Sequence, residues 1–489
     1  MTMRDGGGAR VVAGVDVATA AVRVVCADAR GRVLAKGGAA LPRPERGPGG
    51  RSEQDAGAWW PTAARALRRA TSALPGGGRE VVAVAVSATS GTLVPADAHG
   101  RPLGPALMYD DRRGAELNAV AQEAGADRWA GLGLTVGPTA ALGRLAWCLR
   151  EYRAARYVLH TPELLGWRLT GHPVAADWSH TLKTGYDPRA GEWATEAFEA
   201  LEVPGRLLPE VRAPGAEVGR VDAAAAAETG LPEGCSVRLG MTDGCAGQLA
   251  TGAVEPGEFV GVLGTTYVLK GVARDLVRDP AGALYSHRHP DGWWLPGGAS
   301  STGGEALADV PAERLPGLDA AAAARGPASY LCYPLRREGE RFPFVAAGAR
   351  GFTVGAPADD ADRHRGVLEG VAFLERFALD RLAALGAEVS GPLYAAGGGA
   401  RSETWCRIRA TVLDRPLRVA ARAETAMGAA LLASCGTLHP GLGPAARAMT
   451  VSGRRVDPVV SERAALDDAY GRFTAELERR GWAQPPASV

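Results

Sequence analysis

One pattern occurs twice in this 489-residue chain and limits the folds that it can adopt. In both copies an apolar strand leads into a turn of small or hydroxyl-bearing residues, and a second apolar strand follows. The first copy comprises strand 10–16, turn 16–20 and strand 22–28, with a third strand from Val33; the second comprises strand 258–263, the turn Gly264-Thr265-Thr266 and strand 267–269. This repeat predicts two similar halves, each built around a sheet that begins with a hairpin.

Helices are predicted between these strands. Apolar residues recur at helical spacing from Trp59 to Ala70, and the Val/Ala run 81–86 is typical of a strand that is covered on both faces. The fold class is therefore mixed α/β. The Pro256-Gly257 pair directly before the second copy predicts the domain boundary, which gives an N-terminal domain of residues 10–255 and a C-terminal domain of residues 256–489.

Composition narrows the possible partners. Lys+Arg 55 against Asp+Glu 54 leaves a formal net charge of +1, which excludes the broad basic field that non-specific nucleic-acid binding requires. No apolar stretch reaches 18 residues, and Asp16 interrupts the first apolar run, so we expect a cytoplasmic protein without a membrane partner. The seven cysteines are scattered, which favours reduced thiols over a sulfur-bound metal. We expect a monomer or homodimer that binds small molecules.

The first turn contains a candidate ligand-binding carboxylate, Asp16, at the end of an apolar strand and three residues before Thr19. Burying a carboxylate is unfavourable unless it is paired, hydrogen-bonded or close to a cation. A role in binding a metal or substrate is one interpretation. A turn-capping aspartate is the other, and it is the better one for this residue taken alone.

Three further turns have residues suited to phosphate. Gly264-Thr265-Thr266 offers backbone N–H groups and hydroxyls without bulk, and Gly303-Gly304 is a second small-residue turn. Gly397-Gly398-Gly399 and Ser402 stand between a strand and a helix that begins near Glu403, where a flat ligand can approach the helix N-terminus. This last turn does not fit G-x-G-x-x-G, and each turn alone is also compatible with an ordinary hairpin.

Asp243 is the candidate catalytic residue. It stands between the apolar residues before Thr242 and a predicted helix, close to the expected domain boundary. An aspartate at this place is often only a helix N-cap, and that alternative carries substantial weight. Its position beside the boundary favours catalysis.

Taken together and in order, these segments resemble the FGGY carbohydrate kinases over nearly the whole chain. Residues 14–23 are similar to the first phosphate motif of the family, residues 258–270 to the second, and residues 396–402 with 424–430 to the adenosine motif. The resemblance implies two actin-like, ribonuclease-H-like domains flanking a central cleft. It also implies ATP with Mg²⁺ as cofactors and Asp243 as the catalytic base.

The resemblance also implies the remaining site residues. The first domain would carry the sugar site and the first phosphate motif, and the second domain the other phosphate motif and the adenosine motif. The substrate-binding residues are expected to be Asp16, Ser90, Asp111 and Asp243, with Asp16 also holding Mg²⁺ through water. The nucleotide-binding residues are expected to be Thr19, Gly264, Thr265, Thr266, Gly303, Gly304, Gly398, Gly399 and Ser402.

The segments on the sugar side favour one branch of the family. At residues 87–92 the chain has Ser-Ala-Thr-Ser-Gly-Thr, where xylulokinases usually have Gln-Met-His and glycerol kinases Gln-Arg-Glu. This segment, together with 107–110, 182–186 and 339–343, is most similar to the cyanobacterial and plant D-ribulokinase-like branch. We therefore expect phosphorylation of D-ribulose to D-ribulose 5-phosphate.

Two alternatives to a D-ribulokinase stay open. One is a kinase for D-xylulose or for another ketose or polyol. The other is a catalytically weak, actin-like ATP-binding regulator, because Ala18 and Ala20 replace a glycine and a hydroxyl residue that are usual in the first phosphate motif.

Overall fold

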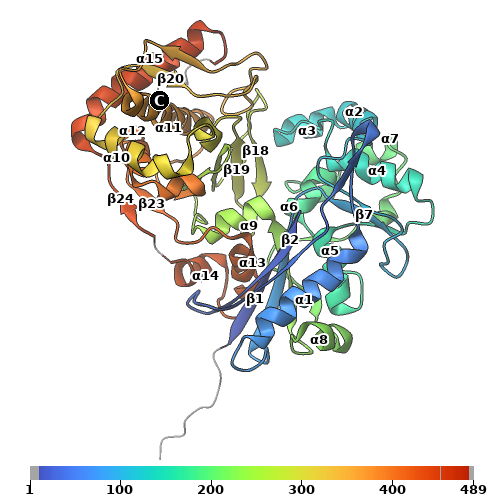
Figure 1. Cartoon of the computed structure of the whole chain (residues 1–489). Coiled ribbons are helices and arrows are strands. Elements are labelled where there is room, and N and C mark those ends of the chain that lie inside the picture. Colours follow the sequence, from blue (N-terminus) through green and yellow to red (C-terminus); the bar gives the residue numbers. More distant parts are fainter. Residues whose placement is uncertain (1–9, 452, 484–489) are drawn as a thin grey trace, which may run out of the picture. The chain divides into compact units, whose positions relative to one another are not determined.

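The computed structural model describes residues 10–451 and 453–483, which form two compact units (Figure 1). Unit 1 comprises the described residues up to Ala250 together with Pro290–Gly292 and Glu424–Thr450. Unit 2 comprises Thr251–His289, Trp293–Ala423 and the described residues from Val451 onward. Both units are built from more than one stretch of the chain, since the late segment Glu424–Thr450 packs with unit 1.

The main sheet of unit 1 has six strands in the order β14-β15-β6-β1-β2-β3. Its strands are β1 (Val11–Ala18), β2 (Ala21–Asp28), β3 (Val33–Ala40), β6 (Val81–Ala88), β14 (Glu217–Arg220) and β15 (Ser236–Thr242). β2 pairs antiparallel with both β1 and β3, whereas β1, β6 and β15 are parallel. The predicted opening hairpin is confirmed, although β1 continues to Ala18 and leaves a turn of only Thr19 and Ala20.

The main sheet of unit 2 repeats this arrangement, in the order β18-β19-β17-β16-β22-β23-β24. Its strands are β16 (Phe259–Leu263), β17 (Tyr267–Gly271), β18 (Tyr285–Arg288), β19 (Trp294–Ala299), β22 (Leu393–Ala396), β23 (Leu417–Val419) and β24 (Arg455–Val456). Antiparallel pairing joins β16, β17 and β19, and parallel pairing joins β16, β22 and β23. The repeat in the sequence therefore corresponds to a repeat of sheet topology, and both units have the predicted mixed α/β character.

The other strands form smaller sheets. Unit 1 carries a five-stranded sheet in the order β4-β5-β8-β7-β9. Its strands are β4 (Glu45–Gly47), β5 (Arg51–Gln54), β7 (Leu93–Ala96), β8 (Ala106–Leu107) and β9 (Tyr157–His160). The two-stranded pairs are β10 (Ala176–Asp177) with β13 (Val211–Arg212), β11 (Tyr186–Asp187) with β12 (Glu192–Trp193), and β20 (Leu331–Tyr333) with β21 (Phe352–Val354).

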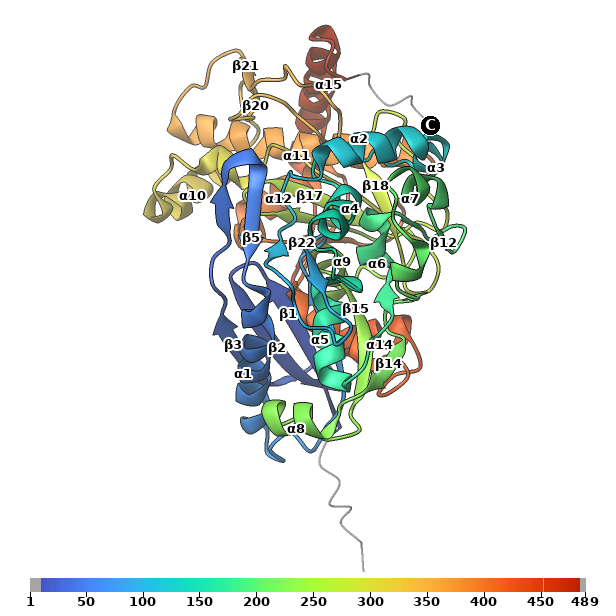
Figure 2. The same cartoon turned by 90° about the vertical axis from the view of Figure 1, so that its right-hand side faces the viewer.

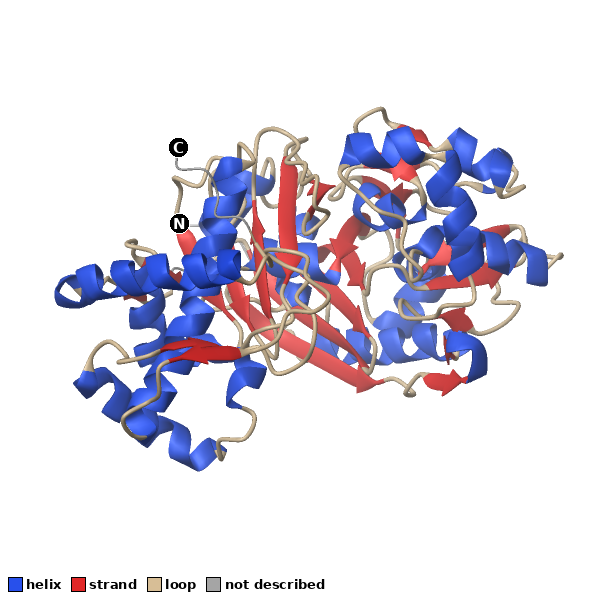
Figure 3. Cartoon of the chain, turned by 90° about the horizontal axis from the view of Figure 1, so that it is seen from above, coloured by secondary structure: helices blue, strands red, loops and turns tan. Residues whose placement is uncertain are grey.

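Helices accompany the sheets of both units (Figure 3). Those of unit 1 are α1 (Trp59–Ser72), α2 (Ala115–Ala124), α3 (Ala126–Leu132), α4 (Ala141–Glu151), α5 (Thr161–Thr170), α6 (Trp178–Thr181), α7 (Thr195–Ala200), α8 (Ala223–Thr229), α9 (Asp243–Ala250), α13 (Thr425–Ser434) and α14 (Leu442–Met449). Those of unit 2 are α10 (Leu315–Arg325), α11 (Asp360–Ala384), α12 (Glu403–Val412) and α15 (Arg463–Arg479). Within the described residues, no helix combines the length and the apolar character needed to cross a lipid bilayer.

Two helices cover opposite faces of β1 in unit 1. Side chains alternate between the faces of a strand, and Val11, Ala13 and Val15 share a buried cluster with residues of α1. The intervening Gly14 faces α13, which contacts β1, β6 and α9. In Figure 2, α1 lies beside β2 and β3.

The contact of α13 with the sheet is unusually close because both partners have glycines there. A Cβ atom added to Gly14 would lie 1.9 Å from the Ala426 carbonyl oxygen, and one added to Gly428 would lie 1.8 Å from that of Ala246 in α9. Any side chain at either position would force the backbones apart. These two glycines therefore set how closely α13 packs against β1 and α9.

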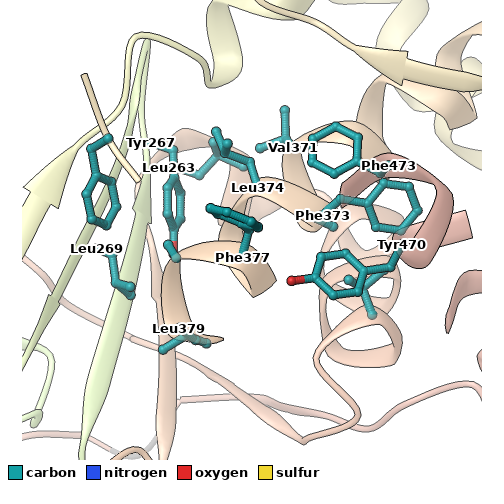
Figure 4. Close-up of a cluster of buried hydrophobic side chains, with 14 of the residues drawn as sticks. Leu263, Tyr267, Leu269, Val371, Phe373, Leu374, Phe377, Leu379, Tyr470 and Phe473 are labelled. Carbon is teal, nitrogen blue, oxygen red and sulfur yellow. The ribbon is translucent and has the colours of Figure 1, made fainter. Parts of the chain in front are cut away.

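The core of unit 2 is aromatic. Figure 4 shows side chains of β16, β17, α11 and α15 facing one another, including Tyr267, Phe373, Phe377 and Phe473. Beside this core lies a buried ion pair, in which Arg409 Nε donates to Glu375 Oε2 at 2.5 Å. Gly261 leaves room for the pair, since an added Cβ would lie 2.4 Å from Glu375 Oε1.

We expect Gly14→Ala to destabilise unit 1 by at least about 2 kcal/mol, because the added methyl group has no space against α13. Gly38→Ala on β3 is the matched control, since the nearest atom to its added Cβ, the Val22 carbonyl oxygen, lies 3.6 Å away. Urea-induced unfolding of the two variants measures the difference. Equal stabilities would contradict the close packing at Gly14.

Candidate functional site

Three parallel strands of unit 1 end at the same edge of the sheet. Asp16 on β1 is in register with Ser87 on β6, and Thr242 on β15 is in register with Ala88. The carboxyl ends of parallel strands are where α/β sheets bind ligands. The predicted residues Asp16, Ser90 and Asp243 all lie at or directly beyond these strand ends.

Asp243 is the first residue of α9, and its side chain is partly exposed. Oδ1 accepts a hydrogen bond from the N–H of Gly244 at 2.7 Å, and the Asp243 carbonyl accepts one from Thr425 Oγ1 of α13 at 3.3 Å. An N-cap aspartate would instead accept from the second or third residue of the helix. The carboxylate thus keeps acceptor capacity for a ligand, which agrees better with the predicted catalytic role than with capping.

Asp16 is buried, and its two oxygens differ in their surroundings. Oδ2 accepts from Arg23 Nη1 at 3.2 Å, whereas Oδ1 has no hydrogen-bond partner among the described residues. Burial raises the pKa of Asp16 to about 6, with the Arg23 charge lowering it and the Asp243 charge raising it. A carboxylate in this state gains most from a nearby cation or from a donor on a ligand.

The surroundings of Asp16 fit a magnesium ion bound through water. Mg²⁺ prefers oxygen ligands and usually retains several waters, with one or two protein carboxylates completing the site. The unpaired Oδ1 supplies one such oxygen. In the part of the chain that the structure describes, no three His, Cys, Asp or Glu side chains gather to hold a metal directly. Asp16 would therefore share the ion with water and ligand oxygens.

The first hairpin turn is held by Gln54. Its Nε2 donates to the carbonyls of Thr19 at 2.8 Å and Pro42 at 2.6 Å, and its Oε1 accepts from Trp59 Nε1 at 2.9 Å. Gln54 is therefore a positioning residue for the turn that contains Thr19. In place of the hydroxyl usual at position 20, the turn presents the exposed Ala20.

The loop after β6 presents two hydroxyl groups. Ser90 Oγ and Thr92 Oγ1 are buried, and neither has a hydrogen-bond partner within the described ranges. A buried hydroxyl without a partner costs free energy that a bound ligand can recover. This arrangement supports Ser90 as a substrate contact and adds Thr92, which lies in the same segment.

Arg144 of α4 links the loop after β6 to the segments that contain Asp111 and Thr139. Its guanidinium is almost fully buried and donates to the carbonyls of Gly91 at 2.6 Å, Asp111 at 3.0 Å and Thr139 at 2.7 Å. Burial lowers the pKa of Arg144 to about 10. Sequence inspection missed this residue, and the only signal was an arginine inside the apolar helical run Ala141–Ala146.

Asp111 is held by hydrogen bonds inside the protein. It is fully buried, and its carboxylate accepts from the Ser52 N–H at 2.8 Å, the Arg113 N–H at 3.0 Å and Arg113 Nη2 at 2.7 Å. These contacts fix the loop that carries Arg113, and the contact of Asp111 with a sugar stays a prediction.

Unit 2 contains a cavity of about 1030 Å³ between the hairpin turn 264–266 and the glycine-rich turn 397–399. Most of the predicted nucleotide-binding residues of this unit line it, namely Gly264, Thr265, Gly304, Gly398, Gly399 and Ser402. Thr266 and Gly303 belong to the same two turns but are not among the residues that line the cavity. Thr19 belongs to unit 1.

The glycines around the cavity have two different functions. A Cβ atom added to Gly303 would lie 2.4 Å from a Thr266 backbone atom, and one added to Gly304 would lie 2.4 Å from the Gly264 carbonyl oxygen. Both glycines are therefore needed for close packing of the turns. Gly398, by contrast, has no described atom within 4 Å of an added Cβ. Its missing side chain leaves open space in the cavity, which suits a flat ligand.

Ser402 acts mainly as a helix cap. Its Oγ accepts from the Trp405 N–H at 3.0 Å and donates to Asp319 Oδ2 at 2.6 Å. Asp319 of α10 also lines the cavity, and its Oδ1 lies 2.7 Å from His364 Nε2. Asp319 was not predicted, because nothing in the alanine-rich sequence around it indicates a ligand site.

The raised pKa of Asp16 predicts a pH-dependent effect of Asp16→Asn. Because the folded pKa, about 6, lies above the reference value of 3.8, this group destabilises the folded state as the pH rises through that range. At pH 7.5, without divalent cations, we expect the variant to be more stable than the parent by about 1–3 kcal/mol. Loss of the Arg23 pair subtracts little, since Arg23 is mostly exposed.

Urea-induced unfolding at pH 4.5 and pH 7.5 measures this effect. The stability difference should shrink towards zero at the lower pH, where the carboxyl group is protonated in the folded chain. The same difference at both pH values would contradict the assigned pKa.

Comparison with known proteins agrees with the fold. Family models match two segments, the N-terminal domain of the FGGY family of carbohydrate kinases at residues 11–250 and its C-terminal domain at residues 257–437. A xylulose kinase of Streptomyces rubiginosus is 31% identical over 96% of this chain and 98% of its own length. An erythritol kinase of Brucella abortus is 29% identical over 87% of each chain.

Solved structures show the same similarity. The crystal structure of xylulose kinase from Rhodospirillum rubrum has a TM-score of 0.85 and 25% identity, and it covers 96% of this chain and 99% of its own. A structure from Brucella ovis described as a xylulose kinase has a TM-score of 0.84 and 26% identity, covering 96% and 99%. With both domain models matched and relatives aligned over nearly its whole length, the chain belongs to the FGGY family of carbohydrate kinases.

Proposed function

We propose that this carbohydrate kinase transfers the γ-phosphoryl group of ATP to the terminal hydroxyl of a ketopentose, and that its substrate is D-ribulose, giving D-ribulose 5-phosphate. The observation that carries the proposal is the accessible carboxylate of Asp243 beside the buried Asp16, together with the hydroxyls of Ser90 and Thr92. Among the described residues, these hydroxyls have no hydrogen-bond partner. This arrangement suits an alcohol that must be bound, oriented and deprotonated.

Asp243 serves as the general base in this proposal. Its carboxylate accepts the proton of the sugar hydroxyl while that oxygen forms a bond to the γ-phosphorus and the bond to the β-phosphate oxygen breaks. The products are the sugar phosphate and ADP. Asp243 is suited to this step because α9 and α13 hold its backbone while the carboxylate stays accessible.

The remaining residues position the reactants. Phosphoryl transfer is accelerated chiefly by alignment and charge stabilisation. The backbone N–H groups and hydroxyls of Thr265 and Thr266 would bind phosphate oxygens, and Thr19 would do so from unit 1. A bound Mg²⁺ would supply positive charge near Asp16. The proposed reaction requires the nucleotide bound by unit 2 and the sugar bound by unit 1 to meet.

The choice of D-ribulose rests on residues 87–92. Where xylulokinases usually have Gln-Met-His, this chain has small residues, so in this proposal the segment would offer hydroxyl groups to the sugar. Ser90 and Thr92 can each both donate and accept a hydrogen bond. Since D-ribulose and D-xylulose differ in the orientation of one hydroxyl group, a changed set of hydroxyl partners is an effective way to discriminate between them.

D-xylulose is the second candidate, because relatives aligned over nearly the whole chain are named xylulose kinases. An ATP-binding regulator is a third, since Ala18 and Ala20 alter the first phosphate motif. A cytoplasmic location and a monomer or homodimer stay predictions.

A substrate panel tests the proposal. With D-ribulose, D-xylulose, L-ribulose, erythritol, glycerol or no sugar, we expect ADP release to depend on sugar and kcat/KM to be at least about tenfold higher for D-ribulose than for D-xylulose. A coupled ADP-release assay measures each rate. The reverse ranking would assign D-xylulose as the substrate, and turnover without sugar would reject the kinase proposal.

Replacing the general base tests the mechanism. We expect Asp243→Asn to lower kcat by about 10²–10⁴-fold and to leave the melting temperature nearly unchanged, because the side chain is partly exposed. Glu228→Gln, at the exposed end of α8, is a control that should retain full activity. An undiminished rate in the Asp243 variant would remove this residue from the mechanism.

Gly398→Ala tests the nucleotide cavity. The added methyl group meets no described protein atom within 4 Å, so the fold should be unaffected. If ATP occupies the cavity, its dissociation constant should rise about tenfold or more, since the methyl group enters the space of the ligand. Gly471→Ala on α15, equally open and outside the cavity, is the matched control. Calorimetric titration with ATP measures both, and equal affinities would place the nucleotide elsewhere.

A further inference from the structure

Two buried histidines near the candidate sugar site are each paired with a carboxylate. His180 Nδ1 of α6 lies 2.6 Å from Asp177 Oδ2, and His160 Nδ1 of β9 lies 2.6 Å from Glu163 Oε1. The two imidazole rings are 5.7 Å apart. Burying a charged pair carries a large desolvation cost, so these two pairs call for an explanation.

The two pairs differ at the other ring nitrogen. His160 Nε2 lies 3.5 Å from Thr184 Oγ1. His180 Nε2 is buried and has no hydrogen-bond partner in the described parts of the chain, although the side chain is only 1% exposed. A buried ring nitrogen without a hydrogen-bond partner is unfavourable, so this position needs an explanation.

His180 is held rigidly, because Asp177 both caps α6 and binds the imidazole. Asp177 Oδ1 accepts from the Ser179 N–H at 2.8 Å and from Ser179 Oγ at 2.5 Å. Ser179 Oγ in turn accepts from the N–H of Thr242 at 3.0 Å. Since Thr242 directly precedes Asp243, α6 is hydrogen-bonded to the end of the strand that carries the proposed base.

Charge couples the histidine to that base. Burial alone would lower the pKa of His180, but the charge and hydrogen bond of Asp177, with the charges of Glu163 and Asp243, raise it. Burial by itself would raise the pKa of Asp177, but the charge and hydrogen bond of His180 outweigh burial and lower this pKa. Because an interaction between two charges is reciprocal, a positively charged His180 attracts the carboxylate of Asp243.

We propose that the Asp177–His180 pair is a positioning group for Asp243, in which a buried imidazolium held by Asp177 attracts the carboxylate of the base and keeps it in place. This inference rests on the proposed function of Asp243. His180 does not touch the reacting atoms in this scheme and transfers no proton. It acts through the charge that it presents to Asp243 and through the hydrogen bond from Thr242 to Ser179.

Several elements around α6 carry charged or titratable groups. They are Asp177 on β10, Glu163 on α5, His160 on β9, Lys183 in the 3₁₀ turn after α6, Arg212 on β13, Arg238 on β15 and Asp243 itself. Arg212 pairs with Glu210 and Arg238 with Glu217. Neither arginine affects the His180 charge to the extent that Asp177 and Asp243 do.

His180→Gln tests the role of the charge, because glutamine can still donate to Asp177 but carries no charge. We expect kcat to fall about tenfold with the KM for sugar changed less than about threefold. The acid limb of the kcat–pH profile should move to higher pH by about half a unit or more, since the base loses a neighbouring positive charge. Asp177→Asn, which retains the cap, should move the limb in the same direction.

His160→Gln is the matched control. It removes a histidine with the same carboxylate distance and similar burial, but His160 stands on β9 rather than on the helix that is hydrogen-bonded to Thr242. Its acid limb should stay with that of the parent. A purely structural role of buried histidines would instead lower activity in both variants without moving either limb, and that result would overturn the proposal.

A measurement without sugar keeps the inference separate from the proposed function. In protein labelled with ¹⁵N-histidine, the His180 titration midpoint should fall in Asp243→Asn, while that of His160 stays fixed. An unchanged His180 midpoint would reject the coupling even if the kinase assay succeeds. A lowered midpoint in a protein that phosphorylates no sugar would retain the coupling and reject the proposed function.

Discussion

The packing of α13 against β1 and α9 is the contact on which the candidate site depends. Gly14 and Gly428 let the backbones approach so closely that a single methyl group would not fit. Through this contact one helix supports the strand that carries Asp16 and the helix that begins with Asp243. Because α13 lies more than 170 residues after Asp243 in the sequence, the site is complete only when a late segment has folded back onto unit 1.

Electrostatic balance explains why the edge of the unit 1 sheet has cations from several elements. Asp16 and Asp243 disfavour each other's charge, and Asp16 is buried. Arg23 of β2 compensates the first carboxylate, and we infer that His180 of α6 compensates the second. Neither cation cancels the negative charge fully, which leaves the edge suited to a metal ion and to a hydroxyl donor.

Local sequence predicted the hairpins, the glycine turns and the helix that begins at Asp243, because each depends on a few adjacent residues. Side-chain partners depend on tertiary contacts, and these were missed. Arg144 binds carbonyls up to 53 residues away, and Asp319 meets His364 and Ser402 across two helices. A position within a family motif did not reveal that the Asp111 carboxylate and the Ser402 hydroxyl are occupied inside the protein.

The repeated topology shows how one framework can supply two different surfaces. Each sheet places a hairpin turn beside the carboxyl ends of parallel strands, yet unit 1 adds carboxylates there and unit 2 adds glycines. The unit 2 cavity is lined by Glu305, Asp319 and Glu403 as well as Arg401, and so has no basic field. A polyphosphate would have to bind through backbone N–H groups, hydroxyls and an accompanying cation, which agrees with a net charge of only +1.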